Sequence, residues 1–160
     1  MAFNLTGKRV LVTGSSRGIG LSIARAMILE GCLVVLNGRS EKELKSTAES
    51  LQASGYVIGD VSSPADAASL VKKTIDILGG LDILVCNVGD GRSVPPGEET
   101  HEEFMRVFGV NFFGTTNVIE AAKEKLALNR GSIVCISSIC GVETIPGAPL
   151  AYSSAKAALN

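Results

Sequence analysis

The sequence predicts a doubly wound α/β fold, in which helices cover both faces of a parallel sheet. Short apolar runs alternate with longer segments that carry helix-start signals, and the runs are continuously apolar. Continuous apolar runs are typical of parallel strands buried on both faces, and a βαβ alternation joins them by right-handed crossovers. The predicted strands are Val10–Thr13, Cys32–Leu36, Tyr56–Ile58, Asp82–Cys86 and Ser132–Ile136.

Helix signals stand between these runs. A capping box or a proline at the first helical position marks three starts: Ser40–Glu43, Thr100–Glu103 and Ser63-Pro64. Glycines that we expect to close the preceding helices are Gly31, Gly55 and Gly79-Gly80. A further helix is expected to begin near Tyr152, after the fifth predicted strand.

Composition and charge exclude several classes of protein. The chain has 160 residues, and 15 Lys and Arg against 16 Asp and Glu give a net charge of −1. This length predicts one domain over residues 1–160, and 46% hydrophobic with 19% charged residues excludes low-hydropathy disorder. A near-neutral chain offers no electrostatic footprint for nucleic acid or anionic lipid. No apolar run approaches the roughly 20 residues that a membrane span needs.

The cysteines predict no metal site. There are four, without a Cys-x-x-Cys pair, and His101 is the single histidine. Three of the cysteines lie in apolar runs, where a free thiol behaves as a small hydrophobe. The N-terminal segment also lacks the basic and apolar regions of a secretion signal. We therefore expect reduced thiols and a cytoplasmic protein.

A glycine-rich turn follows the first strand. Residues 13–20 read Thr-Gly-Ser-Ser-Arg-Gly-Ile-Gly and open a helix. Glycines there permit positive φ and let the backbone approach a pyrophosphate, which binds at the helix N-terminus. The alternative is a tight strand-to-helix turn without a ligand. The turn predicts a Rossmann-type dinucleotide-binding domain.

The end of the second strand bears on the choice of cofactor. A fold that prefers NAD places Asp or Glu there to bind the ribose 2′-hydroxyl, whereas Arg accommodates a 2′-phosphate. Residues 37–40 read Asn-Gly-Arg-Ser, with Arg39 and no acid before Glu41. With Arg17 in the glycine turn, this pattern favours NADP(H) over NAD(H). The alternative is that both arginines are ordinary surface residues.

Tyr152 and Lys156 share one face of the last predicted helix. An ammonium beside a phenol favours the phenolate, which suits general acid–base chemistry. The alternative is an Ala-rich helix with a solvated lysine.

Polar residues also gather where strands end. Ser137-Ser138, Asn87-Val-Gly89 and Asp60-Val61 follow the fifth, fourth and third predicted strands. Carboxyl ends of parallel strands meet at one sheet edge, where doubly wound folds bind ligands. Asn111 lies in the helix after Thr100, at a position where an apolar residue is the default.

Together these motifs resemble those of the short-chain dehydrogenase/reductase family, over essentially all 160 residues. The segment 13–20 is similar to the family's cofactor motif. Asn87-Val-Gly89 is similar to its Asn-Ala-Gly motif, with valine in place of alanine. Four residues match the order and context of its catalytic tetrad: Asn111, Ser138, Tyr152 and Lys156.

The resemblance implies a role for each tetrad residue. Tyr152 is the expected general acid for carbonyl reduction, or the base for alcohol oxidation. Lys156 favours ionisation of Tyr152 and binds the nicotinamide ribose. Ser138 polarises the substrate carbonyl; we prefer it to Ser137 because it fits Ser-x-x-Gly. Asn111 bends its helix and holds a water that links Lys156 to solvent.

The resemblance also implies the cofactor contacts. Asp60 and Val61 bracket the adenine, Asn87 and Gly89 line the cofactor, and Arg39 meets the 2′-phosphate. Tyr152 and Lys156 complete the set at the nicotinamide end. The expected contacts in the glycine turn are Gly14, Ser16, Arg17, Gly18, Ile19 and Gly20.

The expected function is an NADP(H)-dependent oxidoreductase that interconverts a ketone and a secondary alcohol on a small molecule. Relatives usually continue beyond this point with two further strands and a substrate loop, and they oligomerise through the Tyr152 helix. We therefore expect either a fragment of a longer protein or a short product, and a homodimer or homotetramer at full length. The alternatives are a non-catalytic nucleotide-binding or regulatory protein and an inactive fragment.

Overall fold

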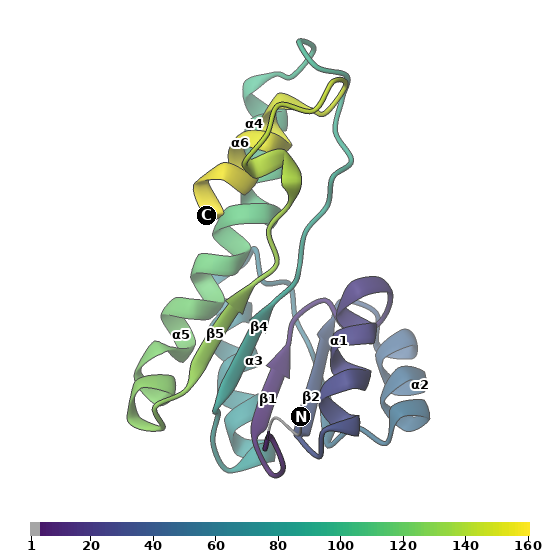
Figure 1. Ribbon diagram of the computed structural model, residues 1–160, viewed down its shortest axis with the longest axis vertical. Coiled ribbons are helices and arrows are strands. Elements are labelled where there is room, and N and C mark those ends of the chain that lie inside the picture. Colours follow the sequence, from purple (N-terminus) through teal and green to yellow (C-terminus); the bar gives the residue numbers. More distant parts are fainter. Residues whose placement is uncertain (1–3) are drawn as a thin grey trace.

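The computed structural model describes residues 4–160 and contains one five-stranded parallel sheet in the order β3-β2-β1-β4-β5 (Figure 1). The strands are β1 Arg9–Val12, β2 Leu33–Gly38, β3 Gly55–Ile58, β4 Ile83–Cys86 and β5 Ser132–Cys135. The chain winds outward from β1 to β3 and then returns to place β4 on the other side of β1. Doubly wound folds bind ligands at this switch point. The predicted fold class is confirmed.

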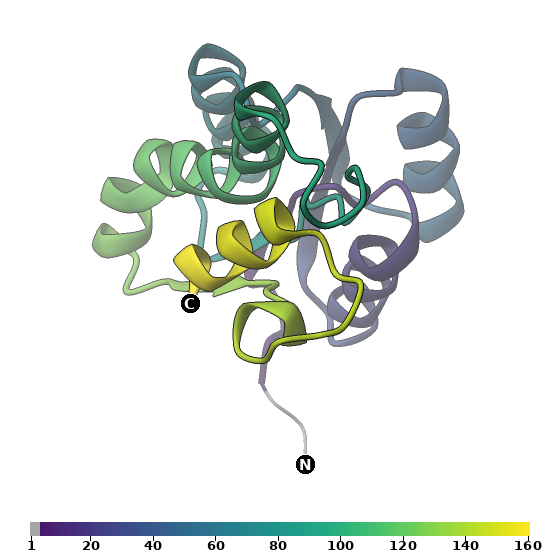
Figure 2. The same ribbon diagram turned by 90° about the horizontal axis from the view of Figure 1, so that it is seen from above.

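Helices cover both faces of the sheet, as Figure 2 shows from above. The helices are α1 Gly18–Leu29, α2 Glu41–Leu51, α3 Pro64–Leu78, α4 His101–Phe108, α5 Gly114–Leu128 and α6 Leu150–Leu159. One apolar core packs α1 and α2 against the sheet, and the other packs α3 and α5 against the opposite face. Above the carboxyl ends of the strands, α4 packs beside α6.

Local signals account for most helix ends. Ser40, Ser63 and Thr100 each accept a hydrogen bond from the backbone N–H three residues on, as their capping patterns predicted. The prediction for Gly55 is wrong, because Gln52 takes the left-handed conformation at the end of α2 and Gly55 begins β3. A Cβ at Gly55 would lie 3.3 Å from the Ile77 side chain, so close packing against α3 explains that glycine.

The helix predicted after Thr100 is interrupted. A π-helical turn, η1 Gly109–Phe113, lies between α4 and α5, and Asn111 is fully buried in it. Asn111 Nδ2 donates to Val107 O one turn earlier, and a side chain inserted into the helical ladder in this way produces such a bulge. The last helix begins at Leu150, two residues before the predicted start.

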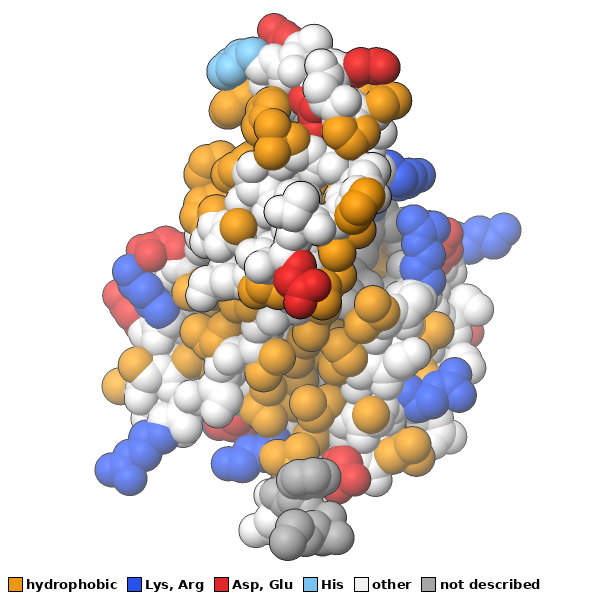
Figure 3. Space-filling model, turned by 45° about the horizontal axis from the view of Figure 1, so that its top comes forward, with side chains coloured by type: hydrophobic (Ala, Val, Ile, Leu, Met, Phe, Trp, Pro, Cys, Tyr) orange, Lys and Arg blue, Asp and Glu red, His pale blue; other side chains and the backbone are white. Residues whose placement is uncertain are grey.

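The β5 side of the sheet is less well covered. Ile133 and Val134 of β5 are 41% and 45% exposed, and apolar residues after the strand, such as Ile139 and Val142, are exposed as well. Figure 3 shows hydrophobic side chains reaching the surface across the middle of the molecule. Within residues 4–160, no helix combines the length and hydropathy required to cross a membrane.

Candidate active site

The glycine turn closes tightly on itself. Gly14 and Gly18 have φ values of 61° and 59°, which favour glycine. A Cβ at Gly20 would lie 2.4 Å from Gly14 O, so no side chain fits there. A Cβ at Gly18, by contrast, would meet nothing within 4 Å. The turn is therefore packed on its inner side and open on the side where the α1 N-terminus begins.

Two asparagines hold this turn from neighbouring strands. Asn87 Nδ2 donates to Thr13 O and Gly14 O at 3.1 Å each, and Asn87 N donates to Thr13 Oγ1 at 2.9 Å. Asn37 Oδ1 accepts from Gly14 N at 3.4 Å, while its Nδ2 donates to Val57 O and Gly59 O. Asn87 was predicted to line a cofactor, and in the structure its side chain fixes the turn.

Sequence reasoning missed the structural roles of Thr13 and Asn37. Both are almost completely buried, at 2% and 1% exposure. Thr13 directly follows β1, and Asn37 is the penultimate residue of β2. A buried polar group needs a hydrogen-bond partner, so a polar residue at that position was the available signal.

The residues expected at the adenosine end lie together after β2 and β3. Arg39 Nη1 lies 3.8 Å from Asp60 Oδ2, and the Arg39 side chain is 74% exposed. The hydrogen bond from Ser62 Oγ lowers the pKa of Asp60, although burial acts in the opposite direction. Val61 is buried in the core. An ionised Asp60 thus stands beside a guanidinium that solvent and ligands can reach.

Arg17 and Ile19 flank the mouth of the turn. Arg17 takes the extended N-cap position of α1, and its side chain is exposed. Ile19 is 64% exposed. Ser16 donates to Glu43 Oε2 at 3.4 Å. Arg17 and Ile19 are therefore exposed beside the turn, whereas Ser16 is half-buried.

Lys156, Asn111 and Gly89 meet above β4 and β5. A Cβ at Gly89 would lie 3.0 Å from Asn111 Oδ1 and 3.1 Å from Lys156 Nζ, so a side chain there would crowd both groups. Lys156 is 3% exposed and its Nζ donates to Ile136 O at 2.9 Å. Burial lowers the pKa of Lys156 below its usual value.

Tyr152 lies beside this group. Its ring centroid is 5.9 Å from Lys156 Nζ. Tyr152, like Phe104 and Phe108 of α4, packs against the buried cluster of Val107, Ala151 and Ala155. A Cβ at Gly91 would lie 3.6 Å from the Tyr152 Cζ atom, so the loop after β4 runs past the phenol.

The two serines after β5 make different contacts. Ser137 Oγ donates to Lys156 O at 3.3 Å, which uses its only hydroxyl hydrogen. Ser138 Oγ accepts from Cys140 N at 3.3 Å, at the start of the short 3₁₀ helix η2 Ile139–Gly141. A hydroxyl that accepts still has its hydrogen to donate. Ser138 is thus the serine with a donor to offer.

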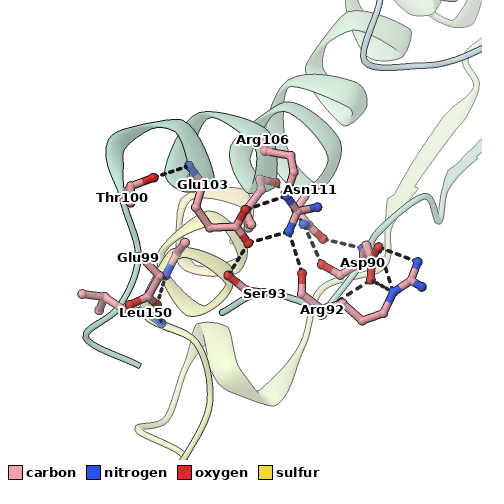
Figure 4. Close-up of polar contacts among 11 residues, drawn as sticks. Asp90, Arg92, Ser93, Glu99, Thr100, Glu103, Arg106, Asn111 and Leu150 are labelled. Atoms are coloured by element: carbon pink, nitrogen blue, oxygen red, sulfur yellow. Dashed lines mark hydrogen bonds and ion pairs between the residues drawn. The ribbon is translucent and has the colours of Figure 1, made fainter. Parts of the chain in front are cut away.

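A polar network ties the loop after β4 to the helices (Figure 4). Asn111 Oδ1 accepts from Asp90 N at 3.0 Å and its Nδ2 donates to Asp90 O at 3.0 Å. The Asp90 carboxylate pairs with the exposed Arg92 at 2.8 Å. Asn111 therefore fixes the loop backbone as well as interrupting its own helix.

A second pair in Figure 4 secures the same loop to α4. Glu103 accepts from Ser93 Oγ at 2.7 Å and pairs with Arg106 at 2.6 Å, and Arg106 also donates to Arg92 O. The hydrogen bonds from Arg106 and Ser93 lower the pKa of Glu103 to about 2. The first half of the loop is thus anchored to η1 through Asp90 and to α4 through Arg92 and Ser93.

Among residues 4–160, no group of three or more His, Cys, Asp and Glu side chains is arranged to hold a metal ion. The glycine turn, by contrast, offers an open helix N-terminus to an anion and lies at the switch point of the sheet. These features fit a dinucleotide.

The chain belongs to the short chain dehydrogenase family, whose model matches residues 8–160. It is 37% identical over 164 residues to glucose 1-dehydrogenase of Gluconobacter oxydans, covering 96% of this chain and 60% of that protein. It is 36% identical over 137 residues to L-fucose dehydrogenase of Mus musculus, covering 85% of this chain and 50% of that protein.

Solved structures agree with this assignment. The Pseudomonas aeruginosa RhlG/NADP active-site complex matches with a TM-score of 0.91 and 28% identity, covering 99% of this chain and 65% of that one. An alcohol dehydrogenase from Thermococcus sibiricus, complexed with 5-hydroxy-NADP, matches with a TM-score of 0.88 and 31% identity, covering 94% and 66%. The chain thus spans between half and two thirds of the length of these relatives.

Proposed function

We propose that the protein is an NADP(H)-dependent oxidoreductase that interconverts a ketone and a secondary alcohol, with Tyr152 exchanging the proton. The observation that carries the proposal is the meeting of Tyr152, Lys156 and Asn111 at the sheet edge that also bears the glycine turn. The names of its relatives, which include dehydrogenases and NADP complexes, support the same class of reaction.

The glycine turn holds the cofactor pyrophosphate in this proposal. Gly14, Gly18 and Gly20 shape the backbone, and the positive end of the α1 dipole faces the phosphates. Ser16, Arg17 and Ile19 contact the cofactor from the open side. When bound, the nicotinamide supplies or accepts the hydride.

The adenosine end selects NADP(H) over NAD(H). The exposed Arg39 guanidinium is free to bind a 2′-phosphate with parallel hydrogen bonds. Asp60 attracts Arg39 from 3.8 Å but holds it in no short contact, so the phosphate can compete for it. Asp60 and Val61 border the adenine, and Gly89 keeps the loop after β4 clear of the cofactor.

Tyr152 and Ser138 act on the substrate. Ser138 donates its free hydroxyl hydrogen to the carbonyl oxygen, and Tyr152 gives that oxygen a proton during reduction. The buried Lys156 ammonium stabilises the phenolate that remains, because charges attract strongly in a water-poor site. Asn111 holds the loop that borders Tyr152. In oxidation of an alcohol, Tyr152 accepts the proton from the hydroxyl group.

The decisive assay follows the near-ultraviolet absorbance of NADPH with a panel of small ketones. The protein is isolated from its source, and its intact mass is measured first. Tyr152→Phe is expected to reduce turnover by about 10²–10⁴-fold, the usual contribution of a general acid. The matched control is Tyr56→Phe, which should retain turnover. Tyr56 lies on β3.

Cofactor binding separates the alternatives. Retained binding of NADPH by Tyr152→Phe, with turnover lost, supports the proposal. NADPH binding without turnover by the wild-type protein on any ketone or alcohol favours a non-catalytic nucleotide-binding protein. Turnover by Tyr152→Phe at the wild-type rate would show that Tyr152 does not exchange the proton.

A further inference from the structure

The helix that carries Tyr152 begins without a local cap. The starts of α2, α3 and α4 are capped by Ser40, Ser63 and Thr100, each at the residue before its helix. The residue before α6 is Pro149, which has no side-chain acceptor. The first N–H groups of a helix have no partner within it, so those of α6 need an acceptor from elsewhere.

Glu99 supplies that acceptor from 51 residues away in the sequence. Its Oε1 accepts from Leu150 N at 2.5 Å and from Ala151 N at 3.3 Å. Its other oxygen, Oε2, accepts from Gly97 N at 2.7 Å, which holds the side chain in place. A carboxylate at a helix N-terminus also interacts favourably with the helix dipole.

The position of Glu99 joins two helices. It directly precedes Thr100, whose hydroxyl caps α4, so adjacent residues cap α4 and α6 (Figure 4). The helices also pack together, because Ala151 and Ala155 are fully buried against Val107. Fixing the first turn of α6 to the start of α4 therefore fixes Tyr152, the third residue of α6, relative to the loop beside it.

We propose that Glu99 is a positioning residue for Tyr152, because its carboxylate secures the first turn of α6 and so holds the phenol at the reacting edge of the sheet. This rests on the proposed function. Desolvation acts to raise the pKa of Glu99, but the backbone N–H donors around the carboxylate outweigh it and lower the pKa below its usual value. Glu99 is thus ionised, in the form that caps best.

The contrast with α1 supports the assignment. α1 also lacks a side-chain cap, and its free N-terminus is where the proposed function places the cofactor phosphates. At α6 the negative group belongs to the protein itself. Glu99 therefore leaves the start of α6 no comparable opening for an anion.

Amide hydrogen exchange tests the cap directly. Glu99→Ala is expected to speed exchange at Leu150 and Ala151 about tenfold, the order that loss of an N-cap produces. Glu99→Gln keeps an amide oxygen that can accept both hydrogen bonds, so it should restore much of the protection. The matched control is Glu98→Ala, because Glu98 is an exposed neighbour of the same type.

A tyrosine label tests the consequence for Tyr152. Residues 1–160 contain two tyrosines, so ¹³C at the phenol carbon gives a resonance for each, and Tyr56 on β3 is an internal reference. Glu99→Ala should move the Tyr152 resonance and leave Tyr56 unchanged. In the assay, it should lower kcat about tenfold with little change in the KM for NADPH, and Glu99→Gln should recover most of that loss.

The outcomes are distinguishable. Unchanged exchange at Leu150 and Ala151, or an unmoved Tyr152 resonance, in Glu99→Ala would overturn the positioning role. Equal losses of amide protection and of kcat in Glu98→Ala and Glu99→Ala would also overturn the positioning role. A third outcome is that Glu99→Ala changes the amide exchange and moves the Tyr152 resonance, while the wild-type protein turns over no carbonyl. This outcome would uphold the effect of Glu99 on Tyr152 and contradict the proposed function alone.

Discussion

The glycine turn and the Tyr152 helix lie at the same edge of the sheet, yet different contacts hold them. Adjacent strand ends hold the turn, through Asn87 from β4 and Asn37 from β2. The Tyr152 helix is capped by Glu99 from the loop after β4 and packs against α4 and η1. The turn follows directly from the sheet topology, whereas the helix is placed by side chains far away in the sequence. Substitutions should therefore damage the two regions in different ways.

The largest effect on stability is expected at Gly20, which packs closely against the backbone of Gly14 in the turn. In Gly20→Ala, the new Cβ would lie 2.4 Å from Gly14 O and 2.5 Å from Asn87 Nδ2, and neither can yield without moving the turn. The free energy of unfolding should fall by about 3 kcal/mol, as expected for an overpacked site. Chemical denaturation measures it. Gly109→Ala, where a Cβ meets nothing within 4 Å, is the control and should be neutral or stabilising. Similar losses in the two variants would contradict this account of the turn.

Asn111→Ala should give the next largest effect, in the other region. It removes three hydrogen bonds to Asp90 and Val107 and leaves buried polar groups unpaired. The expected loss is about 2 kcal/mol of unfolding free energy, with faster amide exchange at Asp90. Asn117→Ala, which removes two hydrogen bonds from a half-buried site, should cost less. The account fails here if the Asp90 amide exchanges at its wild-type rate.

An ion pair at the amino ends of β1 and β4 provides a reference away from the site. Arg9 and Asp82 pair there at 2.7 Å, and the hydrogen bond from Arg9 lowers the pKa of Asp82 from 3.8 to about 2. The stabilisation that this pair gives the folded protein is fully present above pH 3.8 and is lost as the pH falls through about 2. It amounts to about 2 kcal/mol at most.

Thermal unfolding as a function of pH, compared with Asp82→Asn, isolates that contribution. The wild-type protein should lose its advantage over the variant as the pH falls through this range. A constant difference between the two proteins would show that the pair contributes no pH-dependent stability.

The smallest effect on stability is expected at Gly91. A methyl group there would lie at ordinary contact distance, 3.6 Å, from Tyr152 Cζ. Gly91→Ala should change the unfolding free energy by less than about 0.5 kcal/mol. It should raise the KM of a bulky ketone about threefold or more relative to a small one, because it narrows the approach to the phenol. Equal KM changes for both ketones would place the substrate elsewhere.

The fold was largely predictable because its signals are local. Each strand is a short apolar run, and three helix starts carry their own caps, so every strand lies within two residues of its predicted bounds. Gly55 misled the prediction, since a glycine near a helix end can equally begin a strand that needs close packing. The family resemblance implied that Asn111 bends its helix, but no local pattern specified a π-helical turn, because the bond from Asn111 to Val107 replaces a regular helical contact only in the folded chain.

The proximity of the site residues was predictable, but their individual contacts were less so. The family resemblance grouped Tyr152, Lys156, Asn111 and Gly89, and the structure places them side by side. Glu99 carried no signal, because its partners lie 51 and 52 residues further along the chain. Only the packing of α4 against α6 brings it to them.

The most direct test of the central claim is amide exchange measured with and without NADPH. The account predicts that NADPH slows exchange in the segments 13–20, 37–39 and 87–89, around the glycine turn and the ends of β2 and β4. It predicts no comparable change at the pocket that Tyr56, Lys73 and Ile77 line between β3 and α3. Protection confined to that pocket, or no protection at saturating NADPH, would contradict the claim that this edge of the sheet binds the cofactor.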